Sequence, residues 1–144
     1  MFKLPNEVIF YTIERSIKEY RHFAQKQLWK AFPDITVDQA LIFTLISSNP
    51  EMTQEELSDV LFKEKASVTR MIELLRKNGY LNREIHETDR RRFKLTPSKK
   101  GKAALDKIIE IIKQNRTIAL EGINQYDQTH LNETLNKLIK NCTK

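Results

Sequence analysis

Residues 53–95 constrain the fold of this chain most, because their hydrophobic period changes once, at a single glycine. Before Gly79, apolar residues recur at helical spacing over residues 54–61 and again over residues 66–77, with a tight connection between the two runs. After Gly79 the pattern favours a small hairpin, whose second strand, residues 92–95, alternates polar and apolar side chains. The predicted order is therefore a short helix, a turn, a second helix and a hairpin.

Further helices are predicted before and within this stretch. Apolar residues at alternating three- and four-residue steps predict a long helix over residues 6–31. Thr36 followed by Gln39, and Thr53 followed by Glu56, have the spacing of capping boxes, in which a hydroxyl and an N3 side chain satisfy free amides at a helix start. Two more helices should begin at these positions.

Two helices are predicted after the hairpin. Thr96 followed by Pro97 predicts an N-cap with proline at the first helical position, which would open a long helix. A last helix should begin at about Asp127. Gly79 and Gly101 are expected to have structural roles only, with Gly79 at a helix C-cap.

The order of elements predicts a mainly α protein with a small β wing, organised as a winged helix-turn-helix. In that fold the second helix of the pair enters the major groove of DNA. Residues 36–96 would form the DNA-binding winged helix-turn-helix, within a single winged-helix chain spanning residues 1–144. Residues 1–32 and 97–144 would form dimerisation helices on either side of it.

Positive charge is concentrated in the same part of the sequence. Residues 63–102 contain 13 Lys and Arg against 5 Asp and Glu, so their net charge of +8 exceeds the +6 of the whole chain. A basic surface of this kind fits a polyanionic partner. Charge alone also fits a solvated basic face without a partner.

One face of the second helix is left for DNA or solvent. At roughly 100° per residue, Met71, Ile72 and Leu75 fall within about 60° of Val68, so a single apolar stripe is buried. An ordinary amphipathic surface helix would show the same stripe. From the opposite face and its flanks we expect DNA contacts by Lys65, Ser67, Thr69 and Arg70, and phosphate contacts from nearby positions by Thr53, Gln54, Lys63 and Lys77.

The segment KEKASVTRMIELLRKNGYL, which begins at Lys63, is followed by Asp89-Arg90-Arg91 and by LTPSKKG, which begins at Leu95. Together these motifs resemble the MarR family of bacterial transcriptional regulators. In that family's pattern a K-[AS]-[ST]-V-T-R recognition helix ends in K-x-G, and an Asp-x-Arg wing precedes the dimerisation helix. The resemblance covers roughly residues 35–105 in motif and the whole chain in helix order.

The resemblance implies how the wing and the assembly work. In the wing, the aspartate of the motif, Asp89, would hold Arg91 while Arg91 reaches into the minor groove, a role that suits arginine in a narrow, electronegative groove. Arg90 and Arg92 are the other wing residues expected to contact DNA. The family also implies a homodimer with interlocked chain ends, and the apolar stripes of the terminal helices support it, because wide exposed apolar surface usually marks an interface.

A small-molecule effector of unknown identity is a possible further partner. Tyr11, Tyr20, His22, Phe23 and Trp29 of the first helix could line a crevice for it, as in the family, and they fit a core or an interface equally well. The mechanism would be a change in the spacing of the two recognition helices when an effector binds between the dimerisation helices and the winged domain.

Other classes of function have little support in the sequence. His22, His86 and His130 lie in separate elements, and Cys142 is the single cysteine, on an apolar helical stripe where we expect burial, so we expect no metal site and no thiol switch. No arrangement of catalytic residues is evident, so we expect that the protein is not an enzyme and binds no cofactor. Without a long apolar run, no membrane association is expected, and the protein should be cytoplasmic.

The sequence thus predicts a homodimeric, sequence-specific regulator that binds double-stranded DNA, in the form of a ligand-responsive repressor at a pseudo-palindromic operator. The alternative is a winged-helix interaction module that binds protein or RNA and uses its basic face for steering.

Overall fold

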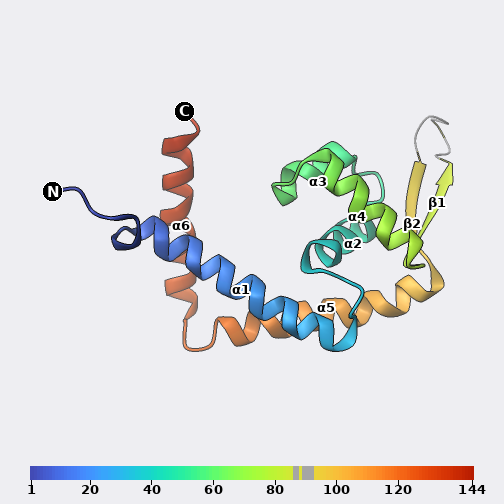
Figure 1. The fold of residues 1–144 in the computed structure, drawn as a ribbon, viewed down its shortest axis with the longest axis horizontal. Coiled ribbons are helices and arrows are strands. Elements are labelled where there is room, and N and C mark those ends of the chain that lie inside the picture. The colour runs from blue at the N-terminus through green and yellow to red at the C-terminus, as the bar shows by residue number, and fades with distance from the viewer. Residues whose placement is uncertain (86–87, 89–92) are drawn as a thin grey trace.

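The computed structural model describes residues 1–85, 88 and 93–144 of the chain (Figure 1). Its elements confirm the expected mainly α fold with a small two-stranded wing. In chain order they are a 3-10 turn η1 (Pro5–Glu7), the helices α1 (Ile9–Ala31), α2 (Val37–Ser48), α3 (Gln54–Leu61) and α4 (Lys65–Lys77), the strands β1 (Leu81–Ile85) and β2 (Phe93–Pro97), and the helices α5 (Lys99–Ala119) and α6 (Gln125–Cys142).

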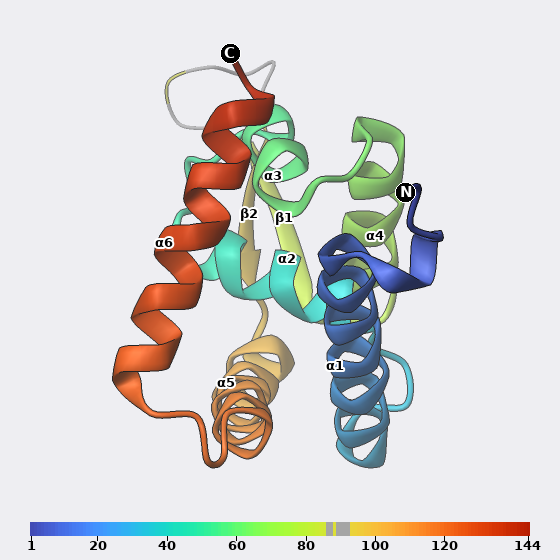
Figure 2. The same cartoon turned by 90° about the vertical axis from the view of Figure 1, so that its left-hand side faces the viewer.

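The molecule divides into a winged-helix body and a set of long helices. The body contains α2, α3, α4 and the antiparallel β1–β2 hairpin, whose register pairs Leu81 with Pro97 and Ile85 with Phe93. Helices α1 and α5 lie beneath the body, where they pack against each other and against α2 of the body. Helix α6 stands apart from the body at the far end of the molecule, near the N-terminus (Figure 1). In the view along the molecule, α5 and α1 lie side by side below the body (Figure 2).

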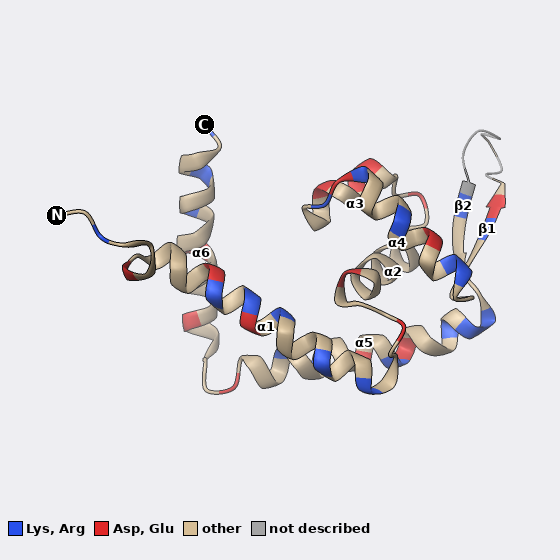
Figure 3. Cartoon of the chain, viewed as in Figure 1, with Lys and Arg blue, Asp and Glu red and all other residues tan. Residues whose placement is uncertain are grey.

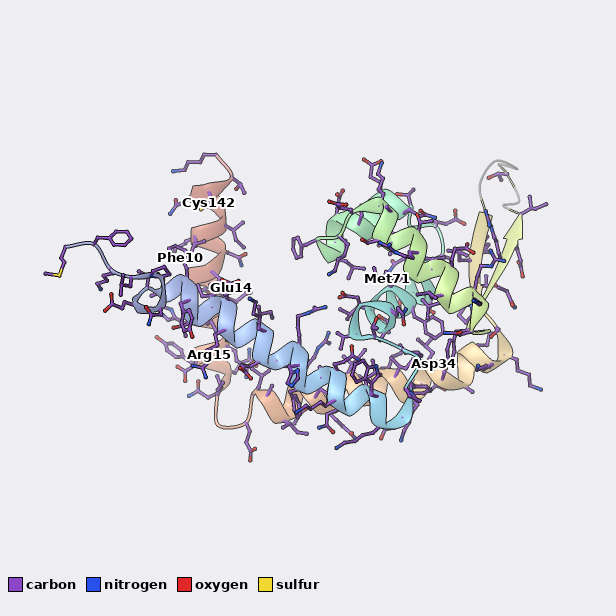
Figure 4. The ribbon with its side chains drawn as sticks, viewed as in Figure 1. Phe10, Glu14, Arg15, Asp34, Met71 and Cys142 are labelled. Atoms are coloured by element: carbon purple, nitrogen blue, oxygen red, sulfur yellow. The ribbon has the colours of Figure 1, made fainter. Side chains whose placement is uncertain are left out.

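The core joins the body to the two helices beneath it. It is built from apolar side chains that α1, α2, α3, α4, β1 and α5 contribute. Ile42 and Phe43 of α2 and Ile108 of α5 are fully buried members of this core. Met71 lies on the side of α4 that faces α2 (Figure 4). The core therefore fixes the orientation of α4 relative to α2 and α5.

The predicted capping boxes are both present. The Thr36 hydroxyl accepts the amide of Gln39, and the Thr53 hydroxyl accepts the amide of Glu56, while each glutamine or glutamate side chain accepts the amide of its threonine. The predicted C-cap is also confirmed, since Gly79 has φ of +84°, in the left-handed region that glycine adopts without steric cost.

The prediction that Thr96 and Pro97 open a helix is wrong. Both residues lie in β2, paired with Asn82 and Leu81. Ser98 is the actual N-cap, because its hydroxyl accepts the amide of Gly101 at 2.9 Å. Proline has no backbone N–H, and the end of an edge strand does not need one for pairing. The hairpin therefore continues two residues further than expected.

The junction between α4 and α5 is closely packed. The Ser98 hydroxyl donates to the Gly79 carbonyl, and Lys100 Nζ donates to the Asn78 carbonyl at 2.7 Å while it lies over the Tyr80 ring. The Tyr80 hydroxyl donates to the carboxylate of Asp34, in the connection between α1 and α2. Burial, with the hydrogen bond and charge of Asp34, raises the pKa of Tyr80 to about 12. Tyr80 therefore stays protonated and links these segments.

Candidate nucleic-acid interface

Helix α4 buries one side and exposes the other, as the sequence predicts. Val68, Ile72 and Leu75 are buried against the core. On the outward side and its flanks the structure places all four residues expected to meet DNA, with Lys65, Thr69 and Arg70 exposed and Ser67 partly so. Their exposure is what contact with base edges requires.

Thr69 and Gln54 connect the starts of α3 and α4. The Thr69 hydroxyl lies 2.7 Å from Gln54 Oε1 and 3.0 Å from the Lys65 carbonyl, the two acceptors available to it. Because Gln54 is the first residue of α3, this contact braces the two helices against each other. Thr69 and Gln54 are thus brought together, and each keeps an exposed side chain for a phosphate or a base.

The basic residues of this surface differ in their freedom. Within the described part of the chain, Arg70 and Lys77 have no ion-pair partner, so both are available to an anionic ligand. Lys65 lies 3.5 Å from Glu55, an exposed pair that contributes little to stability. Lys63 lies 3.0 Å from Asp38. Thr53 keeps its hydroxyl in the N-cap of α3, at an exposed position.

A groove of about 450 Å³ runs between α3, α4 and the hairpin. Thr53, Gln54 and Thr69 line it on the helix side, and Arg83 of β1 lines it on the hairpin side. Arg83 lies 3.9 Å from Glu73 of α4. Strand alternation places Arg83 on the same face as the buried Leu81, but it does not show that this face borders a groove, so Arg83 was not predicted as a site residue.

The charge is distributed unevenly over the body. Lys and Arg gather along α4, the strands and the first turns of α5, whereas α3 carries several Asp and Glu (Figure 3). The predicted wing contacts, Asp89, Arg90, Arg91 and Arg92, lie outside the described residues. Within the described residues, the candidate interface therefore consists of α4, the start of α3 and Arg83.

A smaller cavity of about 140 Å³ lies on the other side of the body, between α1, α2 and α5. Tyr20, Leu28, Leu41 and Ile112 form much of its apolar lining, and Arg21, Asn115 and Arg116 add polar groups. Of the five aromatic and histidine residues proposed for an effector crevice, Tyr20 lines this cavity, while Tyr11, His22 and Trp29 are exposed.

The remaining candidates for chemistry stay apart. Cys142 is exposed in the single chain, near the outer end of α6, in contrast to the expected burial (Figure 4). Among the described residues, no group of three His, Cys, Asp or Glu side chains is arranged to hold a metal ion. None of the described helices is long and apolar enough to cross a membrane.

These features define a winged helix-turn-helix protein with an exposed basic recognition helix. A family model described as MarR family matches residues 34–92, the part that forms this unit. The chain is 25% identical over 108 residues to YybA of Bacillus subtilis (strain 168), an uncharacterized HTH-type transcriptional regulator, covering 75% of this chain and 72% of that protein. Over residues 34–92 the winged helix-turn-helix unit of this chain is thus similar to the MarR family.

Solved structures share the fold over almost the whole chain. Bordetella bronchiseptica BpsR, whose DNA binding is regulated by 6-hydroxynicotinic acid, superposes with a TM-score of 0.81 at 16% identity, covering 96% of this chain and 97% of that one. MepR of S. aureus, in complex with DNA, superposes with a TM-score of 0.80 at 15% identity, covering 94% and 99%. At these identities the likeness is one of fold.

Proposed function

We propose that this protein is a homodimeric, sequence-specific DNA-binding regulator that acts as a ligand-responsive repressor at a pseudo-palindromic operator. The observation that carries the proposal is the outward side of α4, where Arg70 is exposed and, among the described residues, has no ion-pair partner. Arginine in such a position can donate two hydrogen bonds to guanine. Lys77 at the end of α4, with Thr53 and Gln54 at the start of α3, would contact the phosphates that fix the register.

Apolar surface on the terminal helices supports the homodimer. Helix α6 buries none of its side chains in the single chain. Even its apolar residues Leu131 and Ile139 are each more than half exposed. Phe10 and Ile17 of α1 are exposed to a similar degree. A second copy of the chain would cover these residues, and burial of each large side chain is worth about 1.5–3 kcal/mol. Light scattering at micromolar concentration should report twice 17.0 kDa, and a 17.0 kDa monomer would contradict the dimer.

The cavity between α1, α2 and α5 supports the effector. Asn115 lines it and is 4% exposed, so its side-chain amide offers a hydrogen-bond donor and an acceptor to a polar group of a ligand. At about 140 Å³ the space is smaller than the roughly 300–1,000 Å³ of drug-sized sites, so an effector would move α1 relative to the body.

Selection of duplexes from a random library with the full-length protein tests DNA recognition. We expect an inverted repeat to be enriched. In fluorescence anisotropy at one salt concentration, Arg70→Ala should weaken binding to the selected duplex by about 1–3 kcal/mol and narrow its advantage over a scrambled duplex. If no duplex is enriched and binding is insensitive to salt, the interaction module that binds protein or RNA is the better description.

The wing residues are tested in the same assay. Arg91→Ala should weaken binding broadly, because a minor-groove arginine reads groove width more than base identity. Asp89→Ala should reproduce part of that loss, although it removes a negative charge whose loss would by itself favour DNA binding. Tighter binding by Asp89→Ala would refute the orienting role of Asp89.

A further inference from the structure

Three charged side chains from three elements meet beside the start of the recognition helix. Asp38, in the first turn of α2, contacts Arg21 of α1 through one carboxylate oxygen. Its other oxygen lies 3.0 Å from Lys63 Nζ, in the connection between α3 and α4. We refer to Arg21, Asp38 and Lys63 as the charged cluster. The Asp38 side chain is 20% exposed, so its charge is partly shielded from water.

The start of α4 lacks a side-chain cap. Helices α2 and α3 begin with capping boxes, but Glu64, the N-cap residue of α4, makes no side-chain hydrogen bond to its helix. The connection before α4 is held by the Lys63 amide, which donates to the Ser58 carbonyl at 2.9 Å. The ion pair from Lys63 to Asp38 therefore lies where a capping side chain is missing, two residues before α4 begins.

The charged cluster also reaches the long helices. In the described part of the chain, α1 packs against α5 and α2 rather than against α3 or α4. Arg21 belongs to α1 and lines the cavity of about 140 Å³, while its guanidinium contacts Asp38. A shift of α1 at the cavity would thus change the contact between Arg21 and Asp38.

The electrostatics of the cluster keep Asp38 ionised. Burial of this carboxylate acts to raise its pKa, but hydrogen bonds and charges from Lys63 and Arg21 outweigh burial and hold the pKa below its ordinary value of 3.8. A charged hydrogen bond that is partly shielded from solvent is stronger than an exposed surface pair.

We propose that Asp38 is a positioning residue for DNA binding, which holds the start of α4 through Lys63 and connects it through Arg21 to α1 and the cavity. We refer to the ion pair between Asp38 and Lys63 as the tether. Its effect on DNA binding rests on the proposed function, but the tether itself is a property of the free protein. Lys63, which the sequence suggested as a phosphate contact, then acts inside the protein.

Amide hydrogen exchange of the full-length protein without DNA tests the tether. Asp38→Asn and Lys63→Met should each speed exchange in residues 63–68, whereas Lys63→Arg, which keeps the charge, should not. Asp106→Asn is the matched control, because it removes the same charge from an exposed position on α5. Unchanged exchange in both Asp38→Asn and Lys63→Met would overturn the tether, whether or not the protein binds DNA.

Binding to the duplex selected by the wild type tests the consequence for DNA. Asp38→Asn and Lys63→Met should each weaken binding about fivefold, and the double variant should be no weaker than either single variant, because both remove one tie. The dependence of affinity on salt should stay that of the wild type.

The opposite pattern assigns Lys63 to DNA. If the two losses multiply, and Lys63→Met lowers the salt slope by about 0.9 for each phosphate contact removed, Lys63 is a phosphate contact and the proposal is wrong. If the wild type enriches no duplex at all, the proposed function fails while the exchange experiment still decides on the tether.

Discussion

The substitution Gly101→Ala should destabilise the protein although it places a better helix former in α5. A Cβ at this position would meet the Tyr80 carbonyl oxygen at 2.0 Å and Phe43 Cζ at 3.2 Å. The same carbonyl accepts the amide of Ser98 at 3.0 Å, so the backbone of the α4–α5 junction must move and weaken this hydrogen bond.

The magnitude follows from the opposing effects. Overpacking costs about 1–3 kcal/mol, and a lost hydrogen bond about 1 kcal/mol. Alanine gains at most about 1 kcal/mol of helix propensity over glycine. The expected net loss is about 2 kcal/mol in the free energy of unfolding, or roughly 4–8 °C in Tm.

Urea and thermal unfolding at one protein concentration measure this loss. Lys102→Ala, at the exposed neighbouring position of the same helix, is the control and should change stability little. If Gly101→Ala is as stable as the wild type, the close approach of α5 to Tyr80 is wrong, and with it the rigid junction between the winged-helix body and α5.

Three further predictions concern stability. Phe62, which is 93% exposed and has φ of +56°, is strained, so Phe62→Gly should stabilise the protein by about 1 kcal/mol in urea unfolding, and a loss would refute the strain. Tyr80→Phe removes the hydroxyl that donates to Asp34 and should cost about 1 kcal/mol in the same assay, whereas an unchanged midpoint would show that water replaces this contact. The pKa of Asp38 is lower in the folded state than its ordinary value of 3.8, so the ionised carboxylate stabilises the fold. The free energy of unfolding of the wild type should therefore exceed that of Asp38→Asn at pH 7, and the difference should shrink as the pH falls below 3.8. A difference that does not depend on pH would contradict this linkage.

Local signals account for what the sequence could predict. Capping boxes at Thr36 and Thr53 and the glycine at position 79 set helix ends through contacts within a few residues, and the structure has all three. The apolar stripe of α4 likewise determines which side faces outward, so the exposure of Arg70 follows from the spacing alone.

Features that depend on tertiary contacts could not be predicted in this way. Pro97 has the same local signal as a helix start, but its pairing with Leu81 keeps it in the hairpin. Lys63 reads as one more basic residue of a basic segment, and the sequence does not show that Asp38, 25 positions earlier, lies 3.0 Å away. Arg83 is similar, because its place beside the groove depends on how the hairpin packs on α4.

The central claim is that a homodimer places two copies of α4 in successive major grooves, and hydroxyl-radical footprinting on the selected duplex tests it most directly. We predict two protected regions related by a dyad, with centres about 10 base pairs apart or a multiple of that spacing, on one face of the duplex. A single protected region without symmetry, or uniform protection at saturating protein, would contradict the claim.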